Sequence, residues 1–191
     1  MKFLAKSLAV ALLACGVSGP AFAEAPKGWF VAGSTPQDYD FGAEHVDGSA
    51  GAKSAFIRAK TDAPHGFGTL MQEFVPQAYR GKRVRLSARL RTADAARAQL
   101  WMRMDGPDNK ILGFYNMDDR PVVGTAGWSR YDIVLDVPDK TTGLAFGVFL
   151  NGRGEVWMDD FKFEIVSNAV PVSVNPAAEL KNAPSNLGFD Q

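Results

Sequence analysis

The residue types best suited to ligand recognition occur on one predicted strand, residues 98–104. Apolar side chains alternate along this segment, so its polar and aromatic side chains share the opposite side. They are Gln99, Trp101 and Arg103. An indole stacks on the apolar face of a pyranose, while amide and guanidinium groups bond its hydroxyls. The sequence therefore predicts a carbohydrate-binding face around Trp101. The alternative is that a loop or a second apolar layer covers this indole.

A polar segment follows the next predicted strand and is expected on the same face. Its candidate ligand-binding residues are Tyr115, Asn116, Asp118, Asp119 and Arg120. Two carboxylates beside a guanidinium can bond vicinal hydroxyls in pairs. The alternative is a loop that an Asp–Arg ion pair holds together.

The sequence shows no catalytic signature. The two histidines, His45 and His65, lie in polar turns, and the chain has no Gly-x-Ser-x-Gly motif. Two scattered histidines and the one cysteine, Cys15, predict neither a zinc site nor a thiol nucleophile. A glycosidase needs two carboxyls about 5–10 Å apart, and no spacing singles out a pair. We therefore expect a non-catalytic protein, with a glycosidase-type activity as the nearest exception.

The charges balance, with 21 Lys+Arg against 21 Asp+Glu, which argues against a nucleic-acid partner. One segment is nevertheless strongly basic. Its cations are Arg80, Lys82, Arg83, Arg85, Arg89, Arg91 and Arg97. One interpretation is a site for an anionic polysaccharide, and the other is the solvated face of an antiparallel sheet.

The N-terminus is typical of a secretory signal. Lys2 and Lys6 precede a short apolar run, and Ala21-Phe22-Ala23 forms an Ala-x-Ala cleavage site. Cleavage after Ala23 would place the mature chain in the periplasm or outside the cell. The alternative is a lipoprotein that begins at Cys15. No later stretch is apolar for long enough to predict a membrane span.

The remaining pattern is that of an all-β protein. About nine short strands with period-two alternation recur at the spacing typical of an antiparallel jelly-roll β-sandwich. They are residues 39–44, 53–58, 68–74, 83–91, 98–104, 111–117, 128–137, 144–151 and 155–166. Only residues 76–80 and 93–96 suggest helical turns. We expect a signal at 1–23, one sandwich domain at 24–166 and a proline-rich tail at 167–191.

Several motifs in this order resemble galactose-binding-like jelly rolls, which include many carbohydrate-binding modules. They are Gly28-Trp29, Gly48 to Lys53, Tyr79 to Ser87, Trp128-Ser129-Arg130-Tyr131 and Val156-Trp157-Met158-Asp159-Asp160-Phe161. Residues 29–34 also resemble uncharacterised bacterial jelly-roll domains, some of them attached to transcription regulators. The Asn-x-Gly-Phe-Glu-like opening of these domains is found instead at the C-terminus, as Asn186-Leu187-Gly188-Phe189-Asp190. The resemblance thus implies either a circular permutation, in which residues 186–190 dock as the missing first strand, or a repeat cut after its first strand.

The resemblance also implies a structural calcium ion, which ties an acid of the last strand to the opening strand. Here the corresponding residues are Asp160 and Asp190. Because one of two successive strand residues points inward, Asp159-Asp160 should include a buried carboxylate. The alternative is an aspartate that accepts hydrogen bonds from backbone amides.

Together these patterns predict an exported, non-catalytic module that recognises a carbohydrate or another component of the cell envelope. The competing prediction is an accessory or protein-interaction domain without a small-molecule ligand.

Overall fold

The computed structural model describes residues 25–174, and these form an all-β sandwich. The strands are β1 (Phe30–Gly33), β2 (Tyr39–Glu44), β3 (Ser54–Ala59), β4 (Phe67–Phe74), β5 (Lys82–Asp105), β6 (Ile111–Tyr115), β7 (Val122–Val137), β8 (Gly143–Asn151) and β9 (Glu155–Val166). Two three-residue 3₁₀ turns, η1 (Pro36–Asp38) and η2 (Pro107–Asn109), are the only helical segments of the described chain. The all-β prediction is confirmed.

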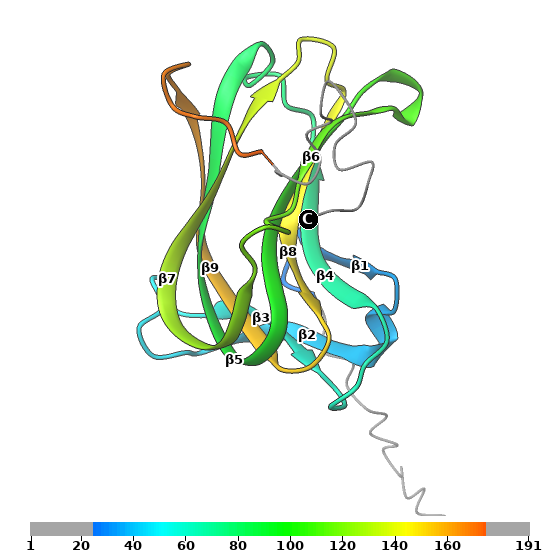
Figure 1. The fold of residues 1–191 in the computed structure, drawn as a ribbon, viewed down its shortest axis with the longest axis vertical. Coiled ribbons are helices and arrows are strands. Elements are labelled where there is room, and N and C mark those ends of the chain that lie inside the picture. The colour runs from blue at the N-terminus through cyan, green and yellow to red at the C-terminus, as the bar shows by residue number, and fades with distance from the viewer. Residues whose placement is uncertain (1–24, 175–191) are drawn as a thin grey trace, which may run out of the picture.

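All strand pairs are antiparallel, and the order is β1-β4-β8-β5-β9-β3-β2, with β6 and β7 also paired to β5. The 24-residue β5 bends from one layer into the other. Its first half pairs with β7 and β9, and its second half pairs mainly with β6 and β8. We call the layer β2-β3-β9-β5-β7 the first sheet and the layer β1-β4-β8-β5-β6 the second sheet (Figure 1).

The core fills the space between the two sheets because apolar residues alternate along each strand. In β5, the even-numbered residues Leu86, Leu90, Leu100 and Met102 are almost fully buried in it. Except around Ala95, which lies in the core, this alternation sends the odd-numbered residues of β5 to the outer faces, which are the surfaces that remain for a ligand.

The helical turn expected at residues 93–96 is wrong, because β5 continues through it. The register with β7 shifts on both sides of Ala95, and Asp94 adopts a positive φ of 47°. The segment thus forms a series of bulges, which give the strand its bend. The turn expected at residues 76–80 is confirmed by hydrogen bonds from the Tyr79 and Arg80 amides to the Pro76 carbonyl.

The first residues of the predicted tail run along β7. The Ser173 amide donates to the Val134 carbonyl (2.7 Å), and the Val134 amide donates to the Ser173 hydroxyl. Arg83 donates to the carbonyls of Asn168 and Val170. Residues 186–190, including Asp190, and the signal segment lie outside the described residues, so these predictions stay predictions. No helix of the described chain has the length and apolarity to cross a membrane.

Candidate binding site

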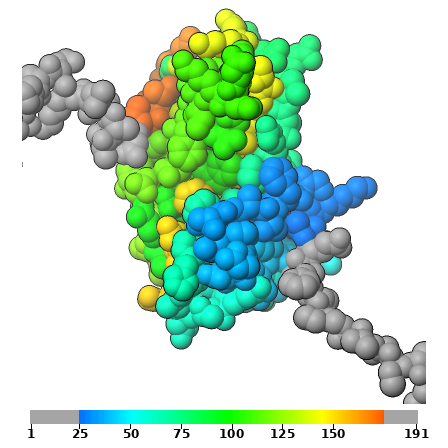
Figure 2. Space-filling view, turned by 90° about the vertical axis from the view of Figure 1, so that its right-hand side faces the viewer, coloured from blue at the N-terminus to red at the C-terminus, as the bar shows by residue number. Residues whose placement is uncertain are grey.

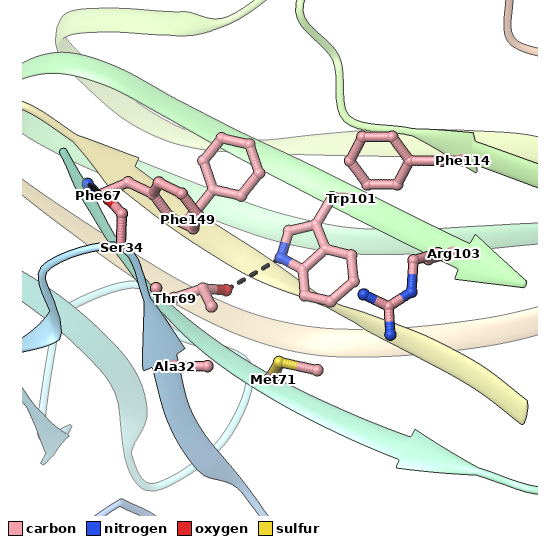
Figure 3. A pocket seen from close by; sticks show the side chains of 10 residues that line it. Ala32, Ser34, Phe67, Thr69, Met71, Trp101, Arg103, Phe114 and Phe149 are labelled. Atoms are coloured by element: carbon pink, nitrogen blue, oxygen red, sulfur yellow. Dashed lines mark hydrogen bonds between the residues drawn. The ribbon is translucent and has the colours of Figure 1, made fainter. Parts of the chain in front are cut away.

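A hollow of about 400 Å³ lies on the outer face of the second sheet, and Trp101 is one of its lining residues (Figure 3). We call it the Trp101 hollow. Strands β1, β4, β5, β6 and β8 supply its lining. The residues are Ala32, Gly33, Ser34, Phe67, Thr69, Met71, Trp101, Arg103, Phe114 and Phe149. The lining is therefore mainly apolar, with one guanidinium.

The Trp101 indole spans a neighbouring strand and is fixed at its far end. In the register, Trp101 faces Gly147 of β8, and Gly147 in turn faces Met71 of β4. Because residue 147 has no side chain, the indole crosses β8 and donates from Nε1 to the Thr69 hydroxyl of β4 (3.0 Å). That hydroxyl donates in turn to the Val148 carbonyl (2.8 Å). The indole is thus positioned by three strands.

Three phenylalanines provide the aromatic surface above the indole. Phe114 of β6 is 51% exposed, and its ring centroid lies 6.4 Å from that of Trp101. Phe67 and Phe149 pack against each other with centroids 5.3 Å apart. Figure 3 shows Phe114 and Phe149 on opposite sides of the indole. A flat apolar molecule, or the apolar face of a sugar ring, fits such a surface.

Arg103 joins the Trp101 hollow to a second, polar hollow of about 460 Å³. Its guanidinium donates to both carboxylate oxygens of Asp105, at 2.9 and 3.1 Å from Nε. Glu73, Asn109 and Thr142 line the same polar hollow. In Figure 2, which views this side of the molecule, the β5–β6 hairpin in green lies above the N-terminal segment in blue. The two hollows together provide an apolar surface beside hydrogen-bonding groups.

Three of the predicted site residues lie on the strand face where the alternation placed them, but only two line the hollow. Trp101 and Arg103 do so, whereas Gln99 is 2% exposed and donates to the Asn116 carbonyl (2.9 Å). The expectation of an open indole is wrong. Trp101 is 5% exposed, because Met71, Ala145 and Phe149 pack around it as a second apolar layer.

The predicted segment 115–120 does not join this site. Tyr115 points into the core, because the register pairs it with the buried Met102 rather than with Trp101. Its hydroxyl donates to Asp119 (2.6 Å) and accepts from Arg120 (3.1 Å). Burial and the bond to Asp119 raise the pKa of Tyr115 above its ordinary value.

Two other residues of the segment also serve the loop rather than the hollow. Asp118 pairs with Arg97 (2.7 Å), and the Asn116 carbonyl accepts the bond from Gln99. The loop held by an Asp–Arg pair, which the sequence left as the alternative, is therefore present.

Neither aspartate of the closing strand is buried as expected, because β9 bulges there and Asp160 adopts a positive φ of 51°. Asp159 accepts bonds from the Ala50 and Gly51 amides at 2.7 and 3.1 Å. Asp160 pairs with Arg130 and Lys162, and the bond from Arg130 holds its pKa below the usual range. Because these two cations already pair with its carboxylate, Asp160 is poorly suited to bind calcium. Among the described residues, no group of three or more metal-ligating side chains forms. Calcium between Asp160 and Asp190 stays a prediction.

Sequence reasoning missed the residues that shape the hollow most. Phe67, Thr69 and Met71 share one side of β4, and strict alternation along residues 67–73 would have grouped them. Phe149 is likewise the one large side chain in the outward series of β8. The outward position of Phe114 could not be predicted from the sequence, because a register shift at Met104/Asp105 decides which residues of β6 face outward.

Comparison with known proteins finds no matching family model. A curated relative is an uncharacterised HTH-type transcriptional regulator, YbfP, of Bacillus subtilis (strain 168), 39% identical over 168 residues. The match covers 86% of this chain and 57% of the regulator. The chain therefore spans little more than half the length of that relative.

Solved structures of similar fold include carbohydrate-binding modules. The C-terminal family 22 carbohydrate-binding module of Clostridium thermocellum Xyn10B has a TM-score of 0.54 at 13% identity, covering 77% of this chain and 91% of the module. The CBM22-1 xylan-binding domain of Paenibacillus barcinonensis Xyn10C gives 0.54 at 12%, covering 76% and 90%. A Stig cyclase from Fischerella sp. TAU gives 0.55 at 10%, covering 76% and 89%. At these identities the likeness shows the fold alone, a jelly-roll β-sandwich that occurs both in carbohydrate-binding modules and in a cyclase.

Proposed function

We propose that the chain is a non-catalytic binding module, and that the Trp101 hollow recognises a neutral carbohydrate. The observation that carries this proposal is an aromatic surface continuous with a polar one. Phe114 and Phe149 offer faces for sugar rings, and Arg103, Asp105 and Asn109 offer hydrogen bonds to hydroxyls. Trp101 acts as the rigid base of this surface rather than as an exposed stacking platform.

The similarity to a transcription regulator supports a recognition role over a purely structural one. The described residues contain no α-helix, so they do not include a helix-turn-helix like the one in the name of that relative. A domain that occurs beside a DNA-binding unit suits the binding of a small molecule that the regulator senses. The ability to bind a small molecule also suits an exported module, and the signal at residues 1–23 predicts export.

The lack of catalysis is part of the proposal. Among the described residues, the carboxylates nearest the hollows include Asp105, which Arg103 holds, and Glu73 at the rim. A glycosidic acid would need a raised pKa, and a second carboxyl would have to face it across the sugar. The protein is expected to release an oligosaccharide unchanged.

The test is a binding screen against neutral oligosaccharides, followed by affinity measurements on two variants. The screen uses xylohexaose, cellohexaose, mannohexaose and β-1,4-galactotriose. Phe114→Ala removes an exposed ring of the hollow and should weaken the selected complex about fivefold or more, as expected for a lost stacking anchor worth about 1–3 kcal/mol.

The matched control is Phe30→Ala, which removes an exposed phenylalanine of the same sheet that does not line the hollow. Its affinity should stay within about twofold of the unmodified protein. Equal losses in both variants, or no binding by the unmodified protein to any glycan in a broad array, would contradict the proposal and favour an accessory, protein-interaction role.

A further inference from the structure

The outer face of the first sheet carries arginines stacked on aromatic rings. Arg58 lies over Phe56 with 4.6 Å to the ring centroid. Arg89 lies over Trp128 and Arg91 over Trp157, each at 5.3 Å. The register places Arg91 of β5 directly opposite Trp157 of β9. This face lies across the core from the Trp101 hollow, so anything bound there would be a separate ligand.

Most cations of this face are neutralised by acids on neighbouring strands. Examples of such ion pairs are Arg83–Asp136, Arg85–Asp132, Arg58–Glu44 and Arg130–Asp160. Arg89 forms no ion pair within the described chain, but it donates to the Gly48 carbonyl (3.0 Å).

Arg91 differs from all of these. Within residues 25–174, its guanidinium forms neither an ion pair nor a hydrogen bond, and it contacts the Trp157 ring. The acid that influences it, Glu155, is held by Arg58. Arg91 therefore retains its hydrogen-bond donors and its charge for an external partner.

A hollow of about 320 Å³ lies beside Arg91, between β5 and β7. It arises from a bulge, because Leu90 pairs with Ser129 while Thr92 pairs with Ala126, leaving one extra residue on β7. The bulge includes Gly127 and Trp128, and both line the hollow. A Cβ added at Gly127 would meet no atom within 4 Å, which shows that the space above it is open.

We propose that this hollow binds the carboxylate-bearing ring of an acidic oligosaccharide. The Arg91 guanidinium pairs with the carboxylate in bidentate fashion, and the Trp128 indole contacts the apolar side of the ring. The volume is at the lower end of the range for small-molecule pockets, about 300–1,000 Å³, so it suits a single sugar unit.

Trp157 extends the site along the face. It lies two strands from Trp128 in the order β9-β5-β7, which at about 4.8 Å per strand separates the two strands by roughly 10 Å. The second indole is thus placed for another unit of the same chain, which favours an oligosaccharide over a monosaccharide.

The test measures binding of trigalacturonate and of its fully methyl-esterified form by calorimetry. The unmodified protein should bind the acid at least tenfold more tightly than the ester, and rising salt should reduce the difference. Arg91→Met keeps the stem over Trp157 but removes the charge, and Gly127→Leu fills the hollow without removing a contact. Each should weaken trigalacturonate binding at least tenfold.

Two control variants match these changes on the same strands. Arg85→Met removes an ion-paired arginine outside the hollow, and Val123→Leu enlarges an exposed residue of β7. Both should bind within about twofold of the unmodified protein. Circular dichroism verifies that each variant is folded. If Gly127→Leu is unfolded, the affinity of Arg91→Met alone tests the proposal. Equal affinity for acid and ester, or unchanged binding by a folded Arg91→Met, would overturn the proposal and leave the Trp101 hollow unaffected.

Discussion

Thr69 is the residue on which the position of Trp101 depends. Its hydroxyl accepts from the indole and donates to the Val148 carbonyl, so a single polar atom connects β4, β5 and β8. Because the indole and the hydroxyl are both buried, neither bond can be replaced by water.

Thr69→Val is therefore expected to lower the free energy of unfolding by about 1–3 kcal/mol, since it leaves the indole N–H buried without an acceptor. Thr69→Ser, which retains the hydroxyl, should cost less. Chemical denaturation of both variants measures the difference. A valine variant as stable as the unmodified protein would show that the indole does not depend on this bond.

Glu155 gives the stability a dependence on pH. Burial raises its pKa above the ordinary value of 4.5, although Arg58 pairs with it. A carboxyl with a raised pKa in the folded state favours folding below its unfolded pKa, and this contribution is lost as pH rises through the folded pKa.

Glu155→Gln has no such group to ionise. Its stability relative to the unmodified protein should therefore increase between pH 4 and pH 7, whatever the absolute effect of losing the pair with Arg58. Urea unfolding across this range tests the sign. A relative stability that stays constant or decreases would mean that Glu155 ionises as easily in the folded protein as in the unfolded chain.

At the scale of single residues, the sequence predicted correctly on which side of a strand a side chain lies. It was less successful in predicting how exposed that side chain is. Alternation correctly separated Trp101 and Arg103 from the core, yet Trp101 is covered by side chains of β4 and β8. Strand neighbours that are distant in sequence decide such coverage, and alternation within one strand says nothing about them.

At the scale of elements, Arg83 connects the segment after β9 to the first sheet. It donates to both oxygens of Asp136 at 2.7 and 2.8 Å, and to the carbonyls of Asn168 and Val170 at 2.6 and 2.7 Å. All of these bonds use the planar fork of the guanidinium, which a lysine lacks.

Arg83→Lys should therefore speed amide hydrogen exchange at Ser173 tenfold or more, the equivalent of about 1.4 kcal/mol of local stability. Arg85→Lys, on the same strand but without contact to this segment, is the control and should leave that exchange unchanged. If both variants exchange alike, the segment is held by its bonds to Val134 alone.

The elements themselves were largely predictable, with two exceptions: β1 was not among the predicted strands, and two predicted segments form the single strand β5. Eight of the nine observed strands fall on segments that alternate in sequence, but β5 joins two of those segments through the bulges around Asp94. Short polar residues and alanines there resemble a turn locally. Pairing with β7, a neighbour in the sheet that is distant in the sequence, keeps them extended.

At the scale of the whole molecule, the two outer faces differ in chemistry. The second sheet presents a mainly apolar hollow with one guanidinium, and the first sheet presents arginines on aromatic rings. We therefore expect two ligands of different charge to bind without competing, since the core separates the two proposed sites.

Export is the other prediction at this scale. Expressed with its own N-terminus in a bacterium, the protein should be recovered from the periplasm with Glu24 as its first residue. Intact-mass spectrometry of that fraction decides the point. A lipidated species that begins at Cys15 would contradict cleavage after Ala23 and support the lipoprotein alternative.

The measurement that tests the central claim most directly is a nuclear magnetic resonance titration of the four tryptophan indole N–H groups. The titrant is the tightest binder among the neutral oligosaccharides of the screen. Binding in the Trp101 hollow predicts a saturable shift of the Trp101 resonance, with those of Trp128 and Trp157 unchanged. A saturable shift of Trp128 or Trp157 while Trp101 stays constant would contradict the assignment of carbohydrate recognition to this face.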